Sequence, residues 1–232
     1  MVVPADAEQG RDACLAILVR APEAGRVKTR LARRIEPEVV LQLYKLFVRD
    51  LLTTVGRTHY PFRIFFYPGD ARARVTAWLG TEHEYRPQRG ADLGERMRNA
   101  LQSCLAEGFR KAVVIGSDSP DLPAVVLAEA FSALDTHDAV IGPATDGGYY
   151  LIGFKDRLVP EAFKVTTWGE PDVFVKTMGI FTKAGSTVRV LDPWPDIDTV
   201  EDLKGFAARH VRDAPESWHT MDFLRIHGGI LA

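Results

Sequence analysis

Short apolar runs alternate with longer segments of helical periodicity along the chain. The run from Ala112 to Ile115 is continuous and rich in β-branched side chains, as in a strand covered on both faces. The segment from Pro37 to Arg57 instead places Val40, Leu43 and Phe47 on one stripe at helical spacing. Because such strands and helices alternate, the pattern predicts an α/β protein built on a mostly parallel sheet.

The same patterns define the individual elements. Strands are expected at 14–20, 62–67, 82–86, 111–115, 139–142, 149–154 and 187–191. Helices are expected at 37–57, in a segment ending at 79, and at 93–108, 124–134, 172–184 and 199–210. The regular alternation ends where the strands at 139–142 and 149–154 meet across a loop. We therefore expect one domain over 1–232, with lobes at about 13–123 and 124–210 and a surface tail at 211–232.

Composition and charge narrow the functional classes. With 232 residues, 46% of them hydrophobic and 26% charged, the chain can bury a sizeable core. A net charge of -2 weighs against general nucleic-acid binding. Cys14 and Cys104 have no metal-type spacing, no apolar run is long enough to cross a bilayer, and the first ten residues lack the apolar core of a signal peptide. We therefore expect a cytoplasmic protein without a nucleic-acid or membrane partner.

The strand at 111–115 ends abruptly in two carboxylates. Gly116 lets the chain turn, and Asp118 and Asp121 follow at the carboxyl end of a parallel-type strand. Open α/β sheets bind ligands at this edge, and two acids there suit a hard divalent cation that carries a phosphorylated ligand. The alternative is purely structural, since Asp also serves in turns and as a helix N-cap.

A basic loop follows the first strand. It carries Arg26, Lys28 and Arg30 but matches neither a P-loop nor the dinucleotide fingerprint. At the carboxyl edge of the sheet these cations can grip a di- or triphosphate, in a turn shaped by Pro22 and Gly25. The alternative is a solvated basic helix face.

Three further loops carry candidate residues. In the first, Gly90 allows close approach of a base that Gln88 can hydrogen-bond, although an ordinary capped loop fits equally. In the second, the glycines at 147 and 148 lie between Asp146 and two tyrosines that offer stacking surfaces, although a Gly-rich hairpin with core tyrosines is equally compatible. In the third, Asp196 and Asp198 precede a Ser/Thr-x-x-acid helix start, so either can ligate a metal opposite the first acid site.

Five motifs together resemble a known family. In order they are Pro-x-x-Gly-x-Val-Lys-Thr-Arg-Leu, Gly-x-Asp-Leu-Gly-Glu-Arg-Met, Gly-Ser-Asp-Ser-Pro-Asp-Leu, Gly-Pro-Ala-x-Asp-Gly-Gly-Tyr-Tyr-Leu-Ile-Gly and Asp-Ile-Asp-Thr-x-Glu-Asp-Leu. From about Leu15 to Phe206 the chain resembles the bacterial radical-SAM/selenodomain-associated transferases, long catalogued as a domain of unknown function. That family includes arsenosugar-biosynthesis glycosyltransferase-like proteins. More distantly, the chain is similar to the guanylyltransferases of 2-phospholactate and of the molybdenum cofactor.

The resemblance implies the nucleotide-diphospho-sugar transferase fold, called GT-A in glycosyltransferases. This is a three-layer α/β/α, Rossmann-like fold with a mostly parallel mixed sheet, in which a nucleotide would lie over the first lobe and an acceptor over the second. Lys28 and Arg30 would hold phosphates, and Asp118 would hold Mg²⁺ or Mn²⁺ together with Asp198 or Asp196. Many glycosyltransferases of this fold carry Asp-x-Asp. Here the acids at 118 and 121 lie three residues apart, so we expect Asp121 to be either a structural acid or an acid that supports the metal ligands without binding the metal.

The expected site residues fall into groups by role. Nucleotide binding is expected of Ala21, Pro22, Gly25, Lys28, Arg30, Gln88, Gly90, Arg96, Ser117 and Asp118. Acceptor binding is expected of Asp146, Gly147, Gly148, Tyr149 and Trp168. Catalytic roles are expected of Lys28, Arg30 and Asp146, and metal ligation of Asp118, Asp198 and Asp196.

Two reactions are compatible with these residues, and a third hypothesis is non-catalytic. A glycosyltransferase would use the metal and Lys28 to stabilise a departing nucleoside diphosphate, while Asp146 positions or deprotonates an acceptor hydroxyl. A nucleotidyltransferase would clamp an NTP with Lys28 and Arg30. No phosphate-binding residue for its acceptor stands out in the second lobe, although Lys164 or Lys176 could serve. The family favours the first reaction and the basic loop the second. A non-catalytic nucleotide-binding protein would be expected to lack the metal acid or the basic loop. The sequence does not indicate the oligomeric state.

Overall fold

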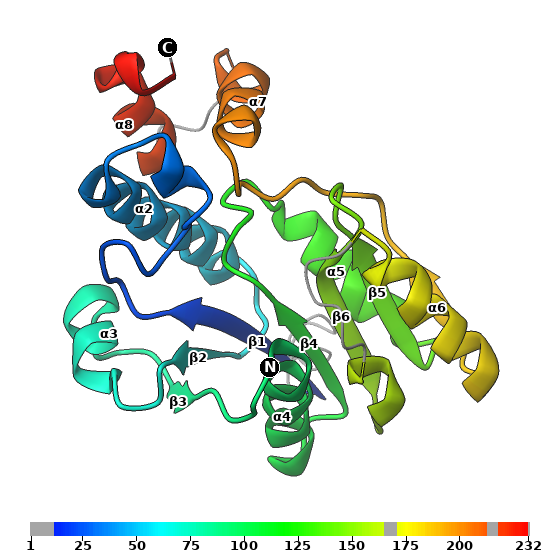
Figure 1. The fold of residues 1–232 in the computed structure, drawn as a ribbon. Helices are drawn as coiled ribbons and strands as arrows, with labels where there is room; N and C mark the ends of the chain where they lie inside the picture. The colour runs from blue at the N-terminus through cyan, green and yellow to red at the C-terminus, as the bar shows by residue number, and fades with distance from the viewer. Residues whose placement is uncertain (1–11, 165–170, 213–217, 232) are drawn as a thin grey trace, which may run out of the picture.

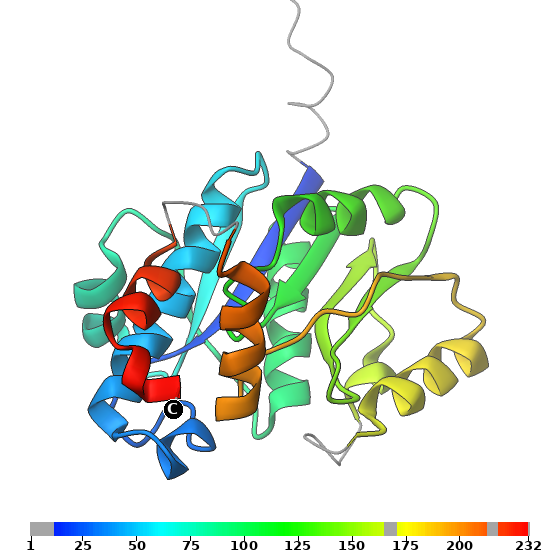
Figure 2. The same ribbon diagram turned by 90° about the horizontal axis from the view of Figure 1, so that it is seen from above.

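The computed structural model describes residues 12–164, 171–212 and 218–231, which form three layers (Figures 1 and 2). Within these residues a seven-stranded sheet has the strand order β3-β2-β1-β4-β6-β5-β7. The strands are β1 (Ala13–Arg20), β2 (Phe62–Tyr67), β3 (Tyr85–Pro87), β4 (Lys111–Ile115), β5 (Ala139–Pro143), β6 (Tyr149–Lys155) and β7 (Val188–Val190). Strand β6 is antiparallel to β4 and β5, and the other neighbours are parallel. The predicted α/β fold with a mostly parallel mixed sheet is confirmed.

Helices cover both faces of the sheet because the strands are apolar on both faces. In β1, Leu15, Ile17 and Val19 pack on one side. Cys14 and Leu18 pack on the other. The first face is covered by α2 (Pro37–Gly56), α3 (Arg72–Leu79) and α5 (Ala124–Ala133). The second face is covered by α4 (Leu93–Ala106), the 3-10 helix η3 (Pro160–Phe163) and α6 (Val173–Ala184). Among the described helices, none is long and apolar enough to span a membrane.

The C-terminal segment is a folded part of the molecule. Helices α7 (Val200–His210) and α8 (His219–Ile226), followed by η4 (Gly228–Leu231), pack with η2 (Leu31–Arg33) and α2 around a third cluster that includes Phe47 and Phe206. Figures 1 and 2 both show α8 lying against α2. The buried Asp50 on α2 accepts hydrogen bonds from the backbone N–H groups of His219, at 2.9 Å, and Thr220, at 2.8 Å. This carboxylate therefore caps α8 from within the core.

The predicted bounds of one strand are clearly shifted, because the pattern predicts 82–86 but β3 spans Tyr85–Pro87. Other elements differ by one or two residues at an end, such as the helix predicted at 93–108, which ends at Ala106. The register pairs Tyr85 with Ile64 and continues for only three residues. Glu82 is exposed and lies beyond the reach of the β2 ladder, so strand pairing rather than local pattern sets this boundary.

Candidate functional site

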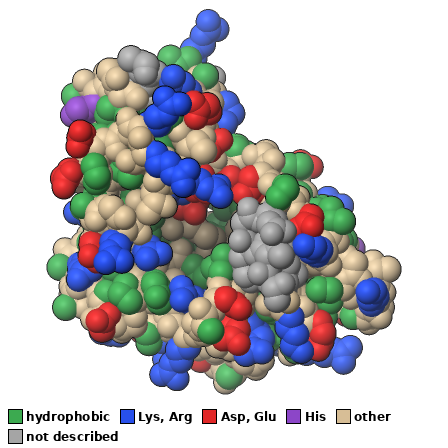
Figure 3. Space-filling view, viewed as in Figure 1, with side chains coloured by type: hydrophobic (Ala, Val, Ile, Leu, Met, Phe, Trp, Pro, Cys, Tyr) green, Lys and Arg blue, Asp and Glu red, His purple; other side chains and the backbone are tan. Residues whose placement is uncertain are grey.

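A cavity of about 570 Å³ opens at the carboxyl ends of β1, β2 and β4, within the size range of small-molecule sites. Figure 3 shows this hollow near the middle of one face, with Lys and Arg side chains gathered above it. Its charged lining residues are Arg20, Arg26, Lys28, Arg30, Arg96, Asp118, Asp146, Asp196 and Asp198. The cavity therefore lies at the sheet edge that the sequence indicated.

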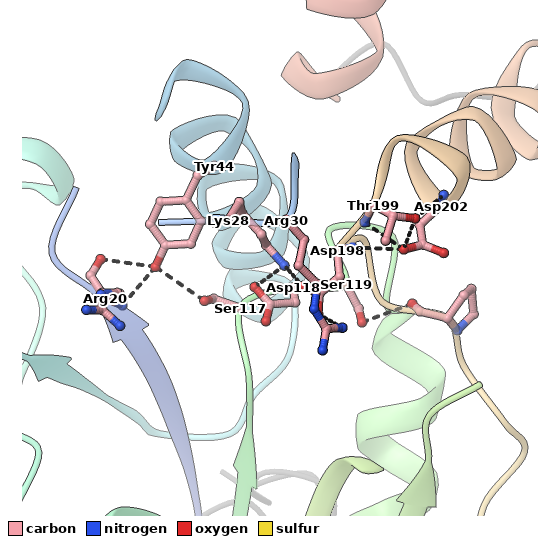
Figure 4. Close-up of polar contacts among 11 residues, drawn as sticks. Arg20, Lys28, Arg30, Tyr44, Ser117, Asp118, Ser119, Asp198, Thr199 and Asp202 are labelled. Carbon is pink, nitrogen blue, oxygen red and sulfur yellow. Dashed lines mark hydrogen bonds and ion pairs between the residues drawn. The ribbon is translucent and has the colours of Figure 1, made fainter. Parts of the chain in front are cut away.

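Lys28 lies between two carboxylates at the base of the cavity (Figure 4). Its Nζ is 2.6 Å from Asp118 Oδ1 and 2.8 Å from Asp198 Oδ1. Arg30 Nη1 is 3.4 Å from Asp198 Oδ2. The Lys28 side chain is only 4% exposed, whereas those of Asp118 and Asp198 are 44% and 31% exposed. The ammonium is thus covered by the protein, while both carboxylates remain accessible to a ligand.

Local structure explains why these three residues meet. The backbone of Lys28 has φ 46°, a left-handed conformation that costs a residue with a side chain about 1–3 kcal/mol. The segment before α7 is fixed to the end of β4, because the Ile197 N–H donates to the Asp118 carbonyl at 2.9 Å. Ser119 Oγ also donates to the Pro195 carbonyl at 3.1 Å. The Thr199–Asp202 capping box then begins α7, so Asp198 stays opposite Asp118.

The neighbouring charges shift the pKa values of the lysine and the carboxylates in the cavity. Burial lowers the pKa of the Lys28 ammonium, but the charges of Asp118 and Asp198 outweigh burial and hold the pKa above its ordinary value. Burial raises the pKa of Asp198, but Lys28 and Arg30 outweigh it and hold the pKa below its ordinary value. Burial, followed by the charges of Asp146 and Asp198, raises the pKa of Asp196 to about 6.

The predicted metal ligands are brought into one cavity. No group of three or more Asp, Glu, His or Cys side chains in the described residues is arranged as a metal cluster. Asp118 and Asp198 nevertheless present oxygens to one point, which the Lys28 ammonium holds, and Asp196 lines the same cavity. One or two carboxylates completed by water and substrate phosphates form a typical Mg²⁺ site. The donor set therefore fits a hard divalent cation, with Lys28 as its competitor.

The end of the cavity near β2 has features suited to a nucleobase. The Arg96 guanidinium lies 3.8 Å from the centroid of the Tyr67 ring. Gln88 Nε2 donates to the carbonyls of Val19, at 3.0 Å, and Phe65, at 2.8 Å. Both hydrogens of the Gln88 side-chain amide are donated to these backbone carbonyls. The Gln88 amide oxygen is therefore the group that can accept a hydrogen bond from a ligand.

Of the other residues predicted to bind the nucleotide, only one lines the cavity directly. Gly90 does not line the cavity, but its carbonyl accepts from Arg96 Nε at 3.2 Å. Ser117 lines it and lies 3.4 Å from the Tyr44 hydroxyl. Ala21 and Pro22 are buried and Gly25 is exposed, and none of the three lines the cavity. Of this predicted loop, the basic side chains of Arg26, Lys28 and Arg30 therefore line the cavity.

Three of the predicted acceptor residues, Asp146, Gly148 and Tyr149, line the cavity in and next to β6, and Gly147 lies between them outside the lining. Asp146 Oδ1 accepts from the Gly148 N–H at 2.9 Å. Gly147 has φ 94°, and a Cβ there would collide with the backbone of Pro171, so this position requires glycine. Tyr149 lines the cavity. Trp168 lies outside the described residues.

Asp121 has the structural role expected of it. It is 3% exposed, and its Oδ1 accepts from Trp194 Nε1 at 3.1 Å. Its Oδ2 lies 3.1 Å from Arg209 Nη2 and 2.8 Å from His210 Nε2. This carboxylate therefore fastens the end of α7 to the loop after β4, and it does not line the cavity.

The cavity-lining residues that the sequence patterns did not indicate include Arg20, Tyr44 and Tyr67. Arg20 and Tyr67 are the last residues of β1 and β2, so the rule that ligands bind at strand carboxyl ends would have found them. Tyr44 lies on the buried stripe of α2. Its hydroxyl accepts from the Arg20 N–H at 2.8 Å and donates to the Arg20 carbonyl at 3.0 Å. Its contribution depends on tertiary packing that no local pattern contains.

The fold is like that of the nucleotide-diphospho-sugar transferases and cytidylyltransferases. The chain belongs to the bacterial family DUF2064, described as an uncharacterized protein conserved in bacteria, which residues 51–170 match.

Solved structures place the chain in the same fold class. A protein from Desulfovibrio desulfuricans, provisionally assigned as a nucleotide-diphospho-sugar transferase, is 38% identical over 95% of this chain and 96% of its own, with a TM-score of 0.90. The 4-diphosphocytidyl-2C-methyl-D-erythritol synthase of Anaerococcus prevotii is 13% identical over 88% of this chain and 99% of its own, with a TM-score of 0.58. A CMP:2-keto-3-deoxy-manno-octonic acid synthetase complexed with CTP is 11% identical over 87% and 99%, with a TM-score of 0.54. None of the curated proteins compared with the chain matches it significantly.

Proposed function

We propose that the protein is a metal-dependent glycosyltransferase that acts from a nucleoside diphosphate sugar on a small-molecule acceptor. The observation that carries the proposal is the convergence of Lys28, Asp118 and Asp198 at the base of a cavity at the sheet edge. The similarity to a nucleotide-diphospho-sugar transferase supports it. The presence of both acids and of the basic loop weighs against a non-catalytic nucleotide-binding role.

The donor would lie along the β1 side of the cavity. Its base would stack near Tyr67 and Arg96 and donate to the Gln88 amide oxygen. Its diphosphate would be held by Lys28 and Arg30, the first as a point charge and the second as a planar fork. These cations stabilise the negative charge that builds on the diphosphate as it leaves.

Asp118 and Asp198, with Asp196 as the alternative partner, would hold the divalent cation. When bound, Mg²⁺ or Mn²⁺ supplies Lewis-acid stabilisation of the diphosphate oxygens. Asp146 would orient the acceptor hydroxyl and take its proton, because it is exposed in the cavity wall on the side opposite the basic loop.

Nucleotidyl transfer from an NTP is the second candidate. The concentration of cations in the loop after β1 suits a triphosphate, and one neighbour of the same fold was solved with CTP. In that reaction the same lysine and arginine would clamp the departing pyrophosphate.

A nucleotide panel tests the choice between the two reactions. The unfolding temperature is recorded with Mg²⁺ or Mn²⁺ and a series of NTPs, nucleoside diphosphates and nucleoside diphosphate sugars. We expect metal-dependent stabilisation by at least one nucleoside diphosphate sugar. Stabilisation by NTPs alone would favour nucleotidyl transfer, and stabilisation by no nucleotide would refute both reactions.

A further inference from the structure

The two sides of the cavity carry opposite charges. Every Lys and Arg among the described lining residues comes from the end of β1, the loop after it, or α4; these are Arg20, Arg26, Lys28, Arg30 and Arg96. The opposite side is built from the loop between β5 and β6, the start of β6, the start of α6 and the segment before α7. Its described lining residues are Ala144, Asp146, Gly148, Tyr149, Tyr150, Val173, Asp196 and Asp198, of which Asp198 is already paired with Lys28 and Arg30 of the basic side.

The acceptor side therefore contains carboxylates and no described cation. The two lysines that the sequence offered for a phosphorylated acceptor both lie outside the cavity lining. Lys164 is 3.6 Å from Glu161, and Lys176 is 2.8 Å from Asp172. The segment 165–170, outside the described residues, has the sequence Val-Thr-Thr-Trp-Gly-Glu and contains no Lys or Arg.

The remaining groups of this side suit a polyol. Carboxylate oxygens accept hydrogen bonds from hydroxyl or ammonium donors, and the faces of tyrosine rings pack on the C–H surface of a sugar. The Tyr150 hydroxyl donates to the Asp192 carbonyl at 3.1 Å, which fixes its ring at the wall. A phosphate monoester would instead meet like charge and no Arg fork or lysine, the groups that normally bind it.

We propose that the acceptor is an uncharged or cationic hydroxyl compound and that Asp146 and Asp196 exclude phosphorylated acceptors. This proposal rests on the proposed function, because it assumes that the basic side binds the donor. It concerns the chemical class of acceptor and goes beyond the assignment of transferase activity. The proposal also favours glycosyl transfer over nucleotidyl transfer. A phosphorylated acceptor, which nucleotidyl transfer would need, would find no cationic partner on this side.

Matched acceptor pairs test the proposal. The protein is saturated with Mg²⁺ and the nucleoside diphosphate that stabilises it most, and is titrated with glycerol or with glycerol 3-phosphate by calorimetry. Wild type is compared with Asp146→Lys and with Glu38→Lys, which makes the same charge change on an exposed residue of α2 outside the cavity lining. We expect Asp146→Lys to bind glycerol 3-phosphate at least about tenfold more tightly than wild type, and Glu38→Lys to behave as wild type.

A second variant guards against local misfolding. Asp196→Asn removes one negative charge with little change in shape, and we expect it to improve glycerol 3-phosphate binding several-fold. The proposal would be overturned if both cavity variants bound glycerol 3-phosphate no more tightly than wild type does. It would also be overturned if wild type bound glycerol 3-phosphate more tightly than glycerol. Failure of every nucleoside diphosphate to bind with Mg²⁺ would instead refute the proposed function, so the two failures are distinguishable.

Discussion

Lys28 is an internal counter-ion for the two carboxylates that fit a divalent cation. Its ammonium lies within 2.8 Å of both Asp118 and Asp198 while its side chain is 4% exposed. A cation that binds these carboxylates therefore competes with the ammonium for their oxygens, and a displaced ammonium is free to contact a phosphate group. Competition between one lysine and one metal ion is a direct consequence of this geometry.

The Lys28→Met variant tests this competition. In EDTA we expect the free energy of unfolding to fall by about 1–3 kcal/mol, because two carboxylates lose their common partner; their partial exposure keeps the loss below that of a fully buried pair. Excess Mg²⁺ should restore most of this stability and should bind the variant more tightly than wild type. Urea unfolding with and without Mg²⁺ measures both effects.

The control is Arg33→Met, which removes an exposed cation of the same segment that does not line the cavity. It should change neither quantity. Equal stability of Lys28→Met and wild type in EDTA, or a loss that Mg²⁺ does not restore, would contradict the counter-ion role.

At the scale of elements, Asp121 joins α7 to the end of β4. The Asp121→Asn variant replaces a buried carboxylate that accepts from Trp194, Arg209 and His210. We expect a loss of about 2–4 kcal/mol in the free energy of unfolding, since buried charged partners are left poorly matched. Mg²⁺ affinity per folded molecule should remain that of wild type. A weaker Mg²⁺ affinity with unchanged stability would make Asp121 a metal ligand instead.

The cap between α2 and α8 gives a pH dependence. Burial raises the pKa of Asp50, and the hydrogen bonds from Thr220 and His219 only partly offset burial. Because the folded-state pKa lies above the unfolded value, the Asp50 contribution is fully present below the unfolded pKa and is lost as the pH rises through the folded pKa. Relative to Asp50→Asn, which does not titrate, wild type should therefore gain stability as the pH falls from 7 to 4, as measured by urea unfolding. A stability difference independent of pH would contradict this.

The elements themselves were largely predictable, for identifiable reasons. Strand β4 matches its predicted span 111–115 because both of its faces are buried and its apolar run is continuous. Asp92 and Thr199 begin α4 and α7 as N-caps, as the local patterns indicated. The start of β3 was missed because it is set by the register against β2, which lies outside its own sequence.

At the scale of the whole molecule, the site depends on contacts that the sequence only suggests. The motifs indicated Lys28, Asp118 and Asp198 separately, and the rule for strand ends predicted the edge on which they gather. The Lys28–Asp198 ion pair joins residues 170 positions apart, and no local pattern specifies such a contact. The backbone hydrogen bond from Ile197 to Asp118 supplies the missing constraint.

The charge separation across the cavity is also a property of the whole molecule. The cations come from the segments around β1 and α4, whereas Asp146 and Asp196 come from chain segments that follow α5. The net charge of -2 conceals this arrangement, because the two signs nearly cancel over the chain. Only the folding of the two halves against one another creates a cationic wall opposite an anionic wall.

The central claim is that Asp118 couples a divalent cation to nucleotide binding, and one titration tests it most directly. The affinity of wild type, Asp118→Asn and the exposed control Asp192→Asn for the best nucleoside diphosphate sugar is measured by calorimetry with Mn²⁺ and with EDTA. We predict that Mn²⁺ tightens binding at least about tenfold in wild type and in the control, but less than about twofold in Asp118→Asn. Undiminished metal dependence in Asp118→Asn would contradict the assignment of this cavity as the metal and nucleotide site.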